Sequence, residues 1–103
     1  MNLVFKALSH PVRRQIVDML REGPLSSGDI AAAFDMAWPS VTGHLTALKE
    51  AGLVEAERYG TTVRYRLNIS AAEEALGFLL GVVQPLKRTM KAPRRRAGRA
   101  RST

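Results

Sequence analysis

Apolar residues in the first half of the chain recur every three or four positions, in runs that end at serine, glycine or proline. Such spacing is typical of amphipathic helices that bury one face. It predicts four helices, near residues 3–8, 11–22, 27–34 and 38–51. The fourth has the clearest inner stripe, which consists of Val41, Leu45 and Leu48.

Residues with strong capping preferences stand at the ends of these helices. Ser9 can cap the second helix, and its neighbour His10 is expected to have a local structural role. Ser26, followed by Asp29, resembles a capping box for the third helix. Gly52 is predicted to end the fourth helix in the left-handed conformation. The third and fourth helices are joined by a tight connection, which is the pattern of a helix-turn-helix.

Two short runs after the fourth helix alternate between apolar and polar residues around a turn at Gly60-Thr61, which predicts a β-hairpin. A two-residue loop gives the cross-strand pairs Val54–Leu67, Glu55–Arg66, Ala56–Tyr65 and Glu57–Arg64. The apolar pairs then share one face and the opposite charges share the other, which supports this register. We therefore expect a winged helix-turn-helix, a mainly α-helical fold with a two-stranded β-wing.

The chain after the hairpin predicts a last helix from about Ala71 to Gln84, with Ser70 as its cap. Its apolar residues lie around much of the circumference: Leu76, Phe78, Leu79, Leu80, Val82 and Val83. A helix of this kind must be buried on more than one side. A dimer interface is the common use of such a helix, and a ligand pocket is the alternative.

The formal net charge of +7 is concentrated at the C-terminal end. Residues 87–103 contain eight Lys and Arg residues and no acid, which leaves eight bases and nine acids in residues 1–86, a net charge of −1. We expect residues 1–86 to form the folded domain and residues 87–103 to be a basic, disordered tail. The tail either contacts DNA phosphates or has no function, and the sequence leaves both open.

Several function classes are disfavoured by what the sequence lacks. It contains no cysteine, which excludes disulfides, thiolate metal sites and cysteine nucleophiles. Its two histidines are separated and its carboxylates do not cluster, so we expect neither an enzyme nor a metal or cofactor site. The apolar stretch 75–83 is shorter than the about 20 residues that span a bilayer. Because the N-terminus also lacks a signal-peptide pattern, we expect a cytoplasmic protein without membrane insertion.

Four segments occur together in a characteristic order: FKALSHPVRRQI (5–16), DIAAAF (29–34), PSVTGHL (39–45) and LKEAGLV (48–54). In this combination the chain resembles the ArsR family of bacterial repressors, especially its SdpR-type autorepressor branch. The resemblance covers roughly residues 3–68. It implies a homodimer that binds an inverted-repeat operator in double-stranded DNA, with the fourth helix on the bases and the wing on the flanking backbone.

The face of the fourth helix opposite its buried stripe supplies the predicted DNA contacts, together with the wing. The candidates are Trp38, Ser40, Thr42, Gly43, His44, Thr46, Arg58, Tyr59 and Arg64. His44 is predicted to contact DNA, although it could also be half-packed beside Leu45, and Trp38 either lies on the DNA backbone or covers the turn. Gly43 stands where relatives often have a long polar side chain, which weakens base contacts there.

The wing arginines have two alternative roles. In the predicted register Glu57 lies opposite Arg64 and Glu55 lies opposite Arg66, so the arginines either contact DNA or form cross-strand ion pairs. The sequence leaves both roles open. The stronger candidates for DNA contact are nearer the tip and have no opposed acid: Arg58 and Tyr59.

The predicted dimer interface joins the first and last helices through Leu3, Val4, Leu76, Leu79, Leu80 and Val83. The predicted function is a sequence-specific repressor of transcription that acts as a homodimer and is not a thiolate metal sensor. An unidentified small molecule or protein is expected to release it from DNA. The alternative is a winged-helix protein–protein interaction module without specific DNA binding, which Gly43 and the near-neutral domain favour.

Overall fold

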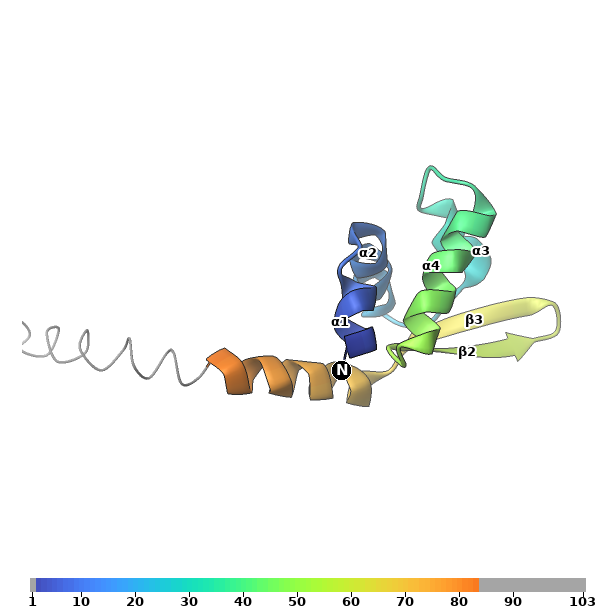
Figure 1. Cartoon of the computed structure of the whole chain (residues 1–103). Helices are drawn as coiled ribbons and strands as arrows, with labels where there is room; N and C mark the ends of the chain where they lie inside the picture. The colour runs from blue at the N-terminus through green and yellow to red at the C-terminus, as the bar shows by residue number, and fades with distance from the viewer. Residues whose placement is uncertain (1, 84–103) are drawn as a thin grey trace, which may run out of the picture. The chain divides into compact units, whose positions relative to one another are not determined.

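The computed structural model describes residues 2–83, which form helices and a small three-stranded antiparallel sheet (Figure 1). Residues 69–83 are helical. This arrangement confirms the predicted mainly α-helical fold with a hairpin wing. The elements before residue 69 are α1 (Asn2–Leu8), α2 (Pro11–Leu20), β1 (Leu25–Ser26), α3 (Ser27–Ala32), α4 (Trp38–Glu50), β2 (Val54–Tyr59) and β3 (Thr62–Leu67).

The hydrophobic core of residues 2–72 is built from the inner faces of the helices and the base of the hairpin. Helices α1, α2 and α4 each contribute residues that are three or four positions apart, as their sequence patterns predict, and α3 contributes Ile30. The buried residues of this core include Val4, Ala7, Ile16, Leu20, Ile30, Val41, Leu45, Leu48, Leu53 and Val54. The predicted stripe of α4 is therefore confirmed, and it fixes which side of this helix faces solvent.

Helix α4 ends in a Schellman motif that directs the chain into the hairpin. Gly52 has a φ of +80°, in the left-handed region that glycine adopts without strain. Its N–H donates to the Lys49 carbonyl at 2.9 Å, and the N–H of Leu53 donates to the Leu48 carbonyl at 3.0 Å. Leu53 is itself buried, so the predicted left-handed cap and folded-back leucine are both confirmed.

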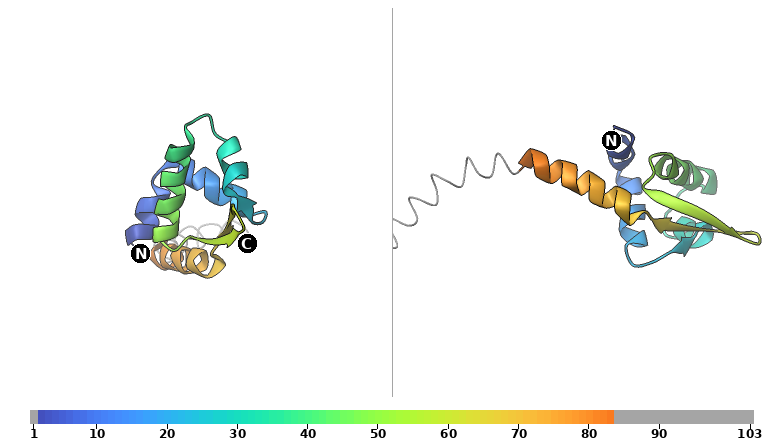
Figure 2. Two further views of the ribbon diagram at one scale, coloured as in Figure 1. Left: turned by 90° about the vertical axis from the view of Figure 1, so that its right-hand side faces the viewer. Right: turned by 90° about the horizontal axis from the view of Figure 1, so that it is seen from below.

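The hairpin has the predicted register, and a strand that the sequence did not predict joins it. The pairs Val54–Leu67, Glu55–Arg66, Ala56–Tyr65 and Glu57–Arg64 are all observed. Strand β1 pairs antiparallel with β3, Leu25 lying opposite Tyr65, so the sheet order is β1-β3-β2. A strand of two residues is too short to show an alternating pattern. The hairpin extends beyond α3 and α4 in Figure 1 and in the right-hand view of Figure 2.

Helix α2 begins at Pro11, as predicted, but its N-cap lies one residue later than predicted. The prediction of Ser9 as N-cap was wrong, because the Nδ1 atom of His10 accepts the N–H of Val12 at 3.3 Å. The Ser9 hydroxyl instead donates to the Lys6 carbonyl at 2.6 Å, at the end of α1. The capping residue predicted for α3 is confirmed, since the hydroxyl of Ser26 accepts the N–H of the third residue after it at 3.1 Å.

The last helix begins earlier than the sequence predicted. Ser70 was predicted as its cap, but Asn68 has this role, its Oδ1 accepting the N–H of Ala71 at 3.2 Å. The backbone N–H of Asn68 donates to the Leu53 carbonyl at 2.8 Å, which holds it directly after β3. The helix consequently starts at residue 69, two residues before the predicted start at Ala71.

The chain divides into two units, the first ending at Ala72 and the second beginning at Glu73. The predicted boundary at residue 86 and the predicted basic tail 87–103 lie outside the described residues. Among residues 2–83, no helix has the length and apolar character needed to cross a membrane.

Candidate nucleic-acid interface

Helix α4 has one buried face and one open face. Val41, Leu45 and Leu48 expose at most 1% of their surface, so the helix cannot rotate about its axis without losing the core. Helix α3 packs against α4 to complete the helix-turn-helix (Figure 1). Of the contact residues predicted on this helix, His44 is half-buried, and the others are exposed: Trp38, Ser40, Thr42, Gly43 and Thr46.

The outer face carries short side chains, and its centre has none. A Cβ atom added to Gly43 would meet nothing within 4 Å, so packing does not require glycine there. A glycine inside a helix costs about 0.5–1 kcal/mol of stability relative to alanine. A bare backbone lets a ligand approach the helix closely, which is one use that offsets this cost.

Trp38, the first residue of α4, approaches α3 on one side and is exposed on the other. A Cβ added to Gly28 would lie 3.5 Å from the Trp38 Cη2 atom, so the indole edge approaches the first turn of α3. The residue nevertheless keeps 57% of its surface exposed. The indole therefore approaches α3 and still presents an amphipathic surface at the N-terminal end of α4.

His44 lies at the flank of the outer face and is tied to α2. Its Nδ1 atom accepts a hydrogen bond from Nε of Arg13 at 3.1 Å, and its ring centroid lies 4.4 Å from that of His10. Burial, followed by the nearby His10 and Arg13, lowers the pKa of His44 below its ordinary value. The half-packed environment is thus observed, and the contacts that hold the ring come from Arg13 and His10.

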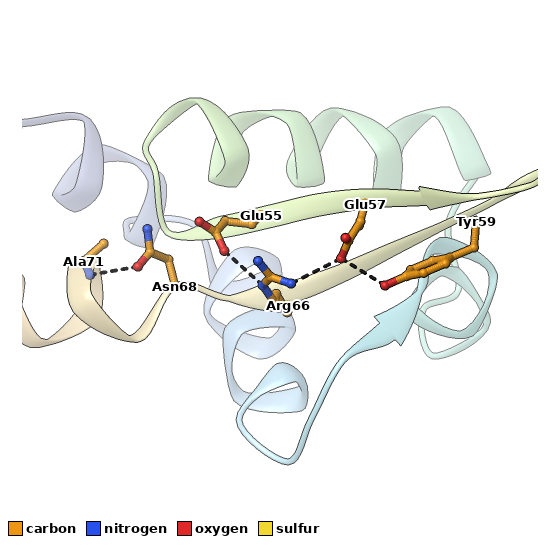
Figure 3. A network of polar contacts seen from close by, with 6 residues as sticks. All are labelled: Glu55, Glu57, Tyr59, Arg66, Asn68 and Ala71. Carbon is orange, nitrogen blue, oxygen red and sulfur yellow. Dashed lines mark hydrogen bonds and ion pairs between the residues drawn. The ribbon is translucent and has the colours of Figure 1, made fainter.

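The hairpin uses one of its two central arginines internally (Figure 3). Nε of Arg66 donates to Glu55 Oε1 at 3.0 Å, and Nη1 donates to Glu57 Oε1 at 3.2 Å. The same Glu57 oxygen accepts the hydroxyl hydrogen of Tyr59 at 3.0 Å. The hydrogen bond to Glu55, then the charges of both acids, raise the pKa of Arg66. Arg66 is therefore the arginine whose positive charge is neutralised by the wing itself.

Arg64 remains a cation without a carboxylate partner in residues 2–83. Its guanidinium carbon lies 5.4 Å from the centroid of the Tyr59 ring, within cation–π range. The acid predicted opposite it, Glu57, pairs diagonally with Arg66 instead. Of the two roles that the sequence left open, cross-strand ion pairing is therefore observed for Arg66 and not for Arg64.

Arg58 lies on the other face of the hairpin, towards α4. It lines an open hollow together with Lys49, the basic residue in the last turn of α4. Lys49 was not predicted as a contact residue, because its position outside the buried stripe is also that of an ordinary solvated lysine. The two cations place positive charge at the junction of α4 and the wing, in a hollow whose lining also includes Glu57.

The residues predicted for a dimer interface differ in exposure. Leu3 is 59% exposed, whereas Val4 is already buried within the chain. The predicted apolar residues of the last helix are all exposed, from 42% to 56% of their surface: Leu76, Leu79, Leu80 and Val83. Within residues 2–83 no group of three or more His, Asp or Glu side chains is arranged to hold a metal ion.

Comparison with known proteins identifies the family. The family model described as "Bacterial regulatory protein, arsR family" matches residues 10–56. The transcriptional repressor SdpR of Bacillus subtilis is 39% identical over 83 residues, which cover 81% of this chain and 92% of SdpR. The chain belongs to the ArsR family. The resemblance stated from the sequence motifs is confirmed, and the family is one of regulatory proteins and not of enzymes.

Structures of other ArsR-type proteins share the fold. An ArsR-like transcriptional regulator from Rhodococcus has a TM-score of 0.73 at 27% identity, covering 88% of this chain and 86% of that one. The homodimeric winged helix-turn-helix DNA-binding domain of a possible ArsR-family regulator from Mycobacterium bovis has a TM-score of 0.66 at 34% identity, with 84% and 82% covered. This ArsR-family chain is thus a winged helix-turn-helix protein, as predicted.

Proposed function

We propose that this ArsR-family protein is a transcriptional repressor that binds an inverted-repeat operator in double-stranded DNA as a homodimer. The observation that carries the proposal is the division of α4 into a fully buried stripe and an open face of small polar residues. The similarity to a protein named as a transcriptional repressor and to a homodimeric DNA-binding domain supports it.

Helix α4 has the size and chemistry for a major groove. The groove is about 12 Å wide, and an α-helix with its side chains is about 10–12 Å across. Hydroxyl groups hydrogen-bond to bases or phosphates, and threonine methyl groups pack on thymine methyls. The residues proposed to face DNA from α4 are Trp38, Ser40, Thr42, Gly43, His44 and Thr46. Short side chains give modest base discrimination, so the dimer must add to it.

The hairpin is proposed to lie on the flanking backbone. Arg64 keeps an unneutralised charge beside Tyr59, and Arg58 shares a hollow with Lys49. Cations at such positions bind phosphates with little sequence preference and make the affinity depend on salt. The wing therefore supplies affinity and orientation, while α4 supplies sequence preference.

Dimerisation is proposed to use Leu3 and the apolar residues of the last helix. Large apolar side chains that are about half exposed in one chain lose contact with water when a second copy covers them. Val4 is already buried, so it has little surface left to contribute. Two-fold symmetry would place the two α4 helices in successive major grooves about 34–36 Å apart.

The dimer is tested by placing a charge in the proposed interface. Leu79→Glu is expected to give monomers in sedimentation analysis and to lose operator binding, because the operator is bound through both copies. Glu74→Lys, at an exposed polar position of the same helix, is the matched control and is expected to remain dimeric. A wild-type protein that is monomeric at micromolar concentration contradicts this part of the proposal.

The basic segment 87–103 is proposed to add phosphate contacts. Each cation that meets a phosphate releases counterions, which steepens the fall of affinity with salt. Deletion of residues 87–103 is expected to lower affinity and flatten its salt dependence, with the operator preference retained. An unchanged salt dependence removes this segment from the mechanism.

Repression follows from occupancy of the promoter, which excludes polymerase, and we infer that it occurs in the cytoplasm. An inducing small molecule or protein would lower the affinity by favouring a form with differently placed α4 helices.

The direct test of the proposed function is titration of the protein with DNA from upstream of its own gene, with random duplex as competitor. Preference for the upstream DNA supports the repressor, whereas equal affinity for both favours the alternative protein–protein interaction module.

A further inference from the structure

The contact between Arg13 and His44 joins α2 to the exposed flank of α4. The two residues are 31 positions apart, and their hydrogen bond at 3.1 Å lies beside the His10 ring. No carboxylate of residues 2–83 forms an ion pair with Arg13. A cation in the first turn of a helix is disfavoured by the helix dipole, so the position has a cost that the contact with His44 offsets.

The direction of this hydrogen bond fixes the form of the imidazole. Arginine is only a donor, so the Nδ1 atom of His44 must be the acceptor and cannot carry a proton. The neutral ring therefore has its proton on Nε2. Protonation of Nδ1 would remove the acceptor and place a second cation against Arg13, next to the His10 ring. Lys6 of α1 and Glu50 of α4 line the adjoining hollow with Arg13.

We propose that Arg13 is a positioning residue for DNA recognition, which holds His44 as the neutral Nε2–H tautomer so that it meets the operator as a hydrogen-bond donor. This inference rests on the proposed function. His44 is half-buried at the edge of the outer face, so one ring nitrogen is held by α2 while the other remains for a phosphate or base acceptor. Arg13 thus acts on DNA only through His44.

The tautomer is measured first, on the protein without DNA, by nitrogen-15 NMR of the histidine rings. In the wild type, Nε2 of His44 is expected to be protonated and Nδ1 not. Arg13→Met is expected to raise the pKa of His44, because it removes a nearby cation and the donor to the neutral form. Arg14→Met is the matched control: it removes the same charge from the next residue, whose side chain donates to the Leu8 carbonyl and not to His44. A His44 pKa and tautomer unchanged by Arg13→Met overturn the proposal.

DNA recognition is measured next, as the ratio of operator to random-duplex affinity at pH 7.5. A change in the charge of the protein alters its affinity for operator and for random duplex alike, so this general electrostatic effect largely cancels in the ratio. Arg13→Met is expected to lower it roughly 3- to 10-fold, the usual worth of one hydrogen bond, and Arg14→Met to leave it unchanged. His44→Asn keeps an acceptor near the Nδ1 position but has no donor at Nε2, so it is expected to lower the ratio by a similar factor.

The two variants should not be additive, because Arg13 acts through His44. The double variant Arg13→Met with His44→Asn is expected to match His44→Asn within about twofold. A ratio that Arg13→Met leaves intact, or effects that multiply in the double variant, overturn the proposal. A wild type without operator preference contradicts the proposed function instead, and the NMR result then still decides the tautomer by itself.

Discussion

The open face of α4 and the face of the hairpin that carries Arg64 and Arg66 are both exposed. They differ in whether their polar groups are already paired within the protein. The hairpin face is rich in charge, but Arg66 is held by Glu55 and Glu57. The α4 face has few charges, and its hydroxyls at Thr42 and Thr46 are exposed. Charge density alone does not distinguish the two arginines, whereas the pairing pattern separates Arg66 from Arg64.

This difference suggests a division of roles. Groups that are already paired within the protein gain little from DNA, because binding would have to break one contact to make another. Unpaired groups on a rigid element have no such cost. We therefore expect sequence preference to depend on α4 and salt-dependent affinity to depend on the unpaired cations of the wing.

The largest expected effect is on the buried side of α4. Leu48→Ala is expected to lower the free energy of unfolding by about 2–5 kcal/mol, because it removes a fully buried side chain and leaves a cavity. Thr46→Ala, two residues away on the open face, is expected to change it by less than about 0.5 kcal/mol. Urea denaturation of both variants measures the contrast, and equal losses would show that the two faces are not distinct.

Arg64 and Arg66 give a matched pair, since each substitution removes one positive charge from β3. Arg64→Ala is expected to reduce the slope of log affinity against log salt concentration by about one, as for one lost phosphate contact. Arg66→Ala is expected to leave the slope unchanged, because its charge is already neutralised by Glu55 and Glu57. The assignment is reversed if Arg66→Ala produces the larger change.

Gly43→Ala tests whether DNA contacts the centre of the open face. The added Cβ meets nothing within 4 Å, so thermal denaturation is expected to show a gain of about 0.5–1 kcal/mol from helix propensity. If DNA approaches the bare backbone there, operator affinity falls while stability rises. Unchanged affinity would mean that the centre of this face does not touch DNA.

The smallest effect expected is a dependence of stability on pH through His44. Its pKa in the folded protein is lowered, so the unfolded chain binds more protons as the pH falls below about 6.5. The free energy of unfolding therefore decreases through that window and levels off below the folded pKa. Chemical denaturation at pH 7.5 and 5.0 should show a smaller decrease for His44→Gln than for the wild type; equal decreases contradict the assignment.

Most of the fold follows from local patterns in the sequence. The buried stripe of α4, the left-handed Gly52 and the hairpin register each depend on residues that are near in sequence or opposite across one turn. The caps at Ser9 and Ser70 were wrong by one or two positions, since neighbouring residues have similar capping preferences and tertiary contacts choose among them. Strand β1 was not predicted, because two residues are too few to show an alternating pattern.

The site was less predictable where side chains choose partners across elements. The sequence gives the residues opposite one another in the hairpin, but the diagonal pair of Arg66 with Glu57 depends on side-chain conformation. Arg13 carries no sequence signal for its contact with His44, because 31 residues separate them and only the packing of α2 on α4 brings them together. Local patterns therefore predict which face is open, and tertiary packing decides which groups on it remain available.

The most direct test of this division is the ratio of operator to random-duplex affinity for the double variant Thr42→Ala with Thr46→Ala. Both hydroxyls lie on the open face, so stability should be almost unchanged. We expect a ratio at least about tenfold lower, with the salt dependence retained, because base contacts typically carry about 1–3 kcal/mol of discrimination. A ratio equal to that of the wild type would contradict the claim that the open face of α4 recognises the operator.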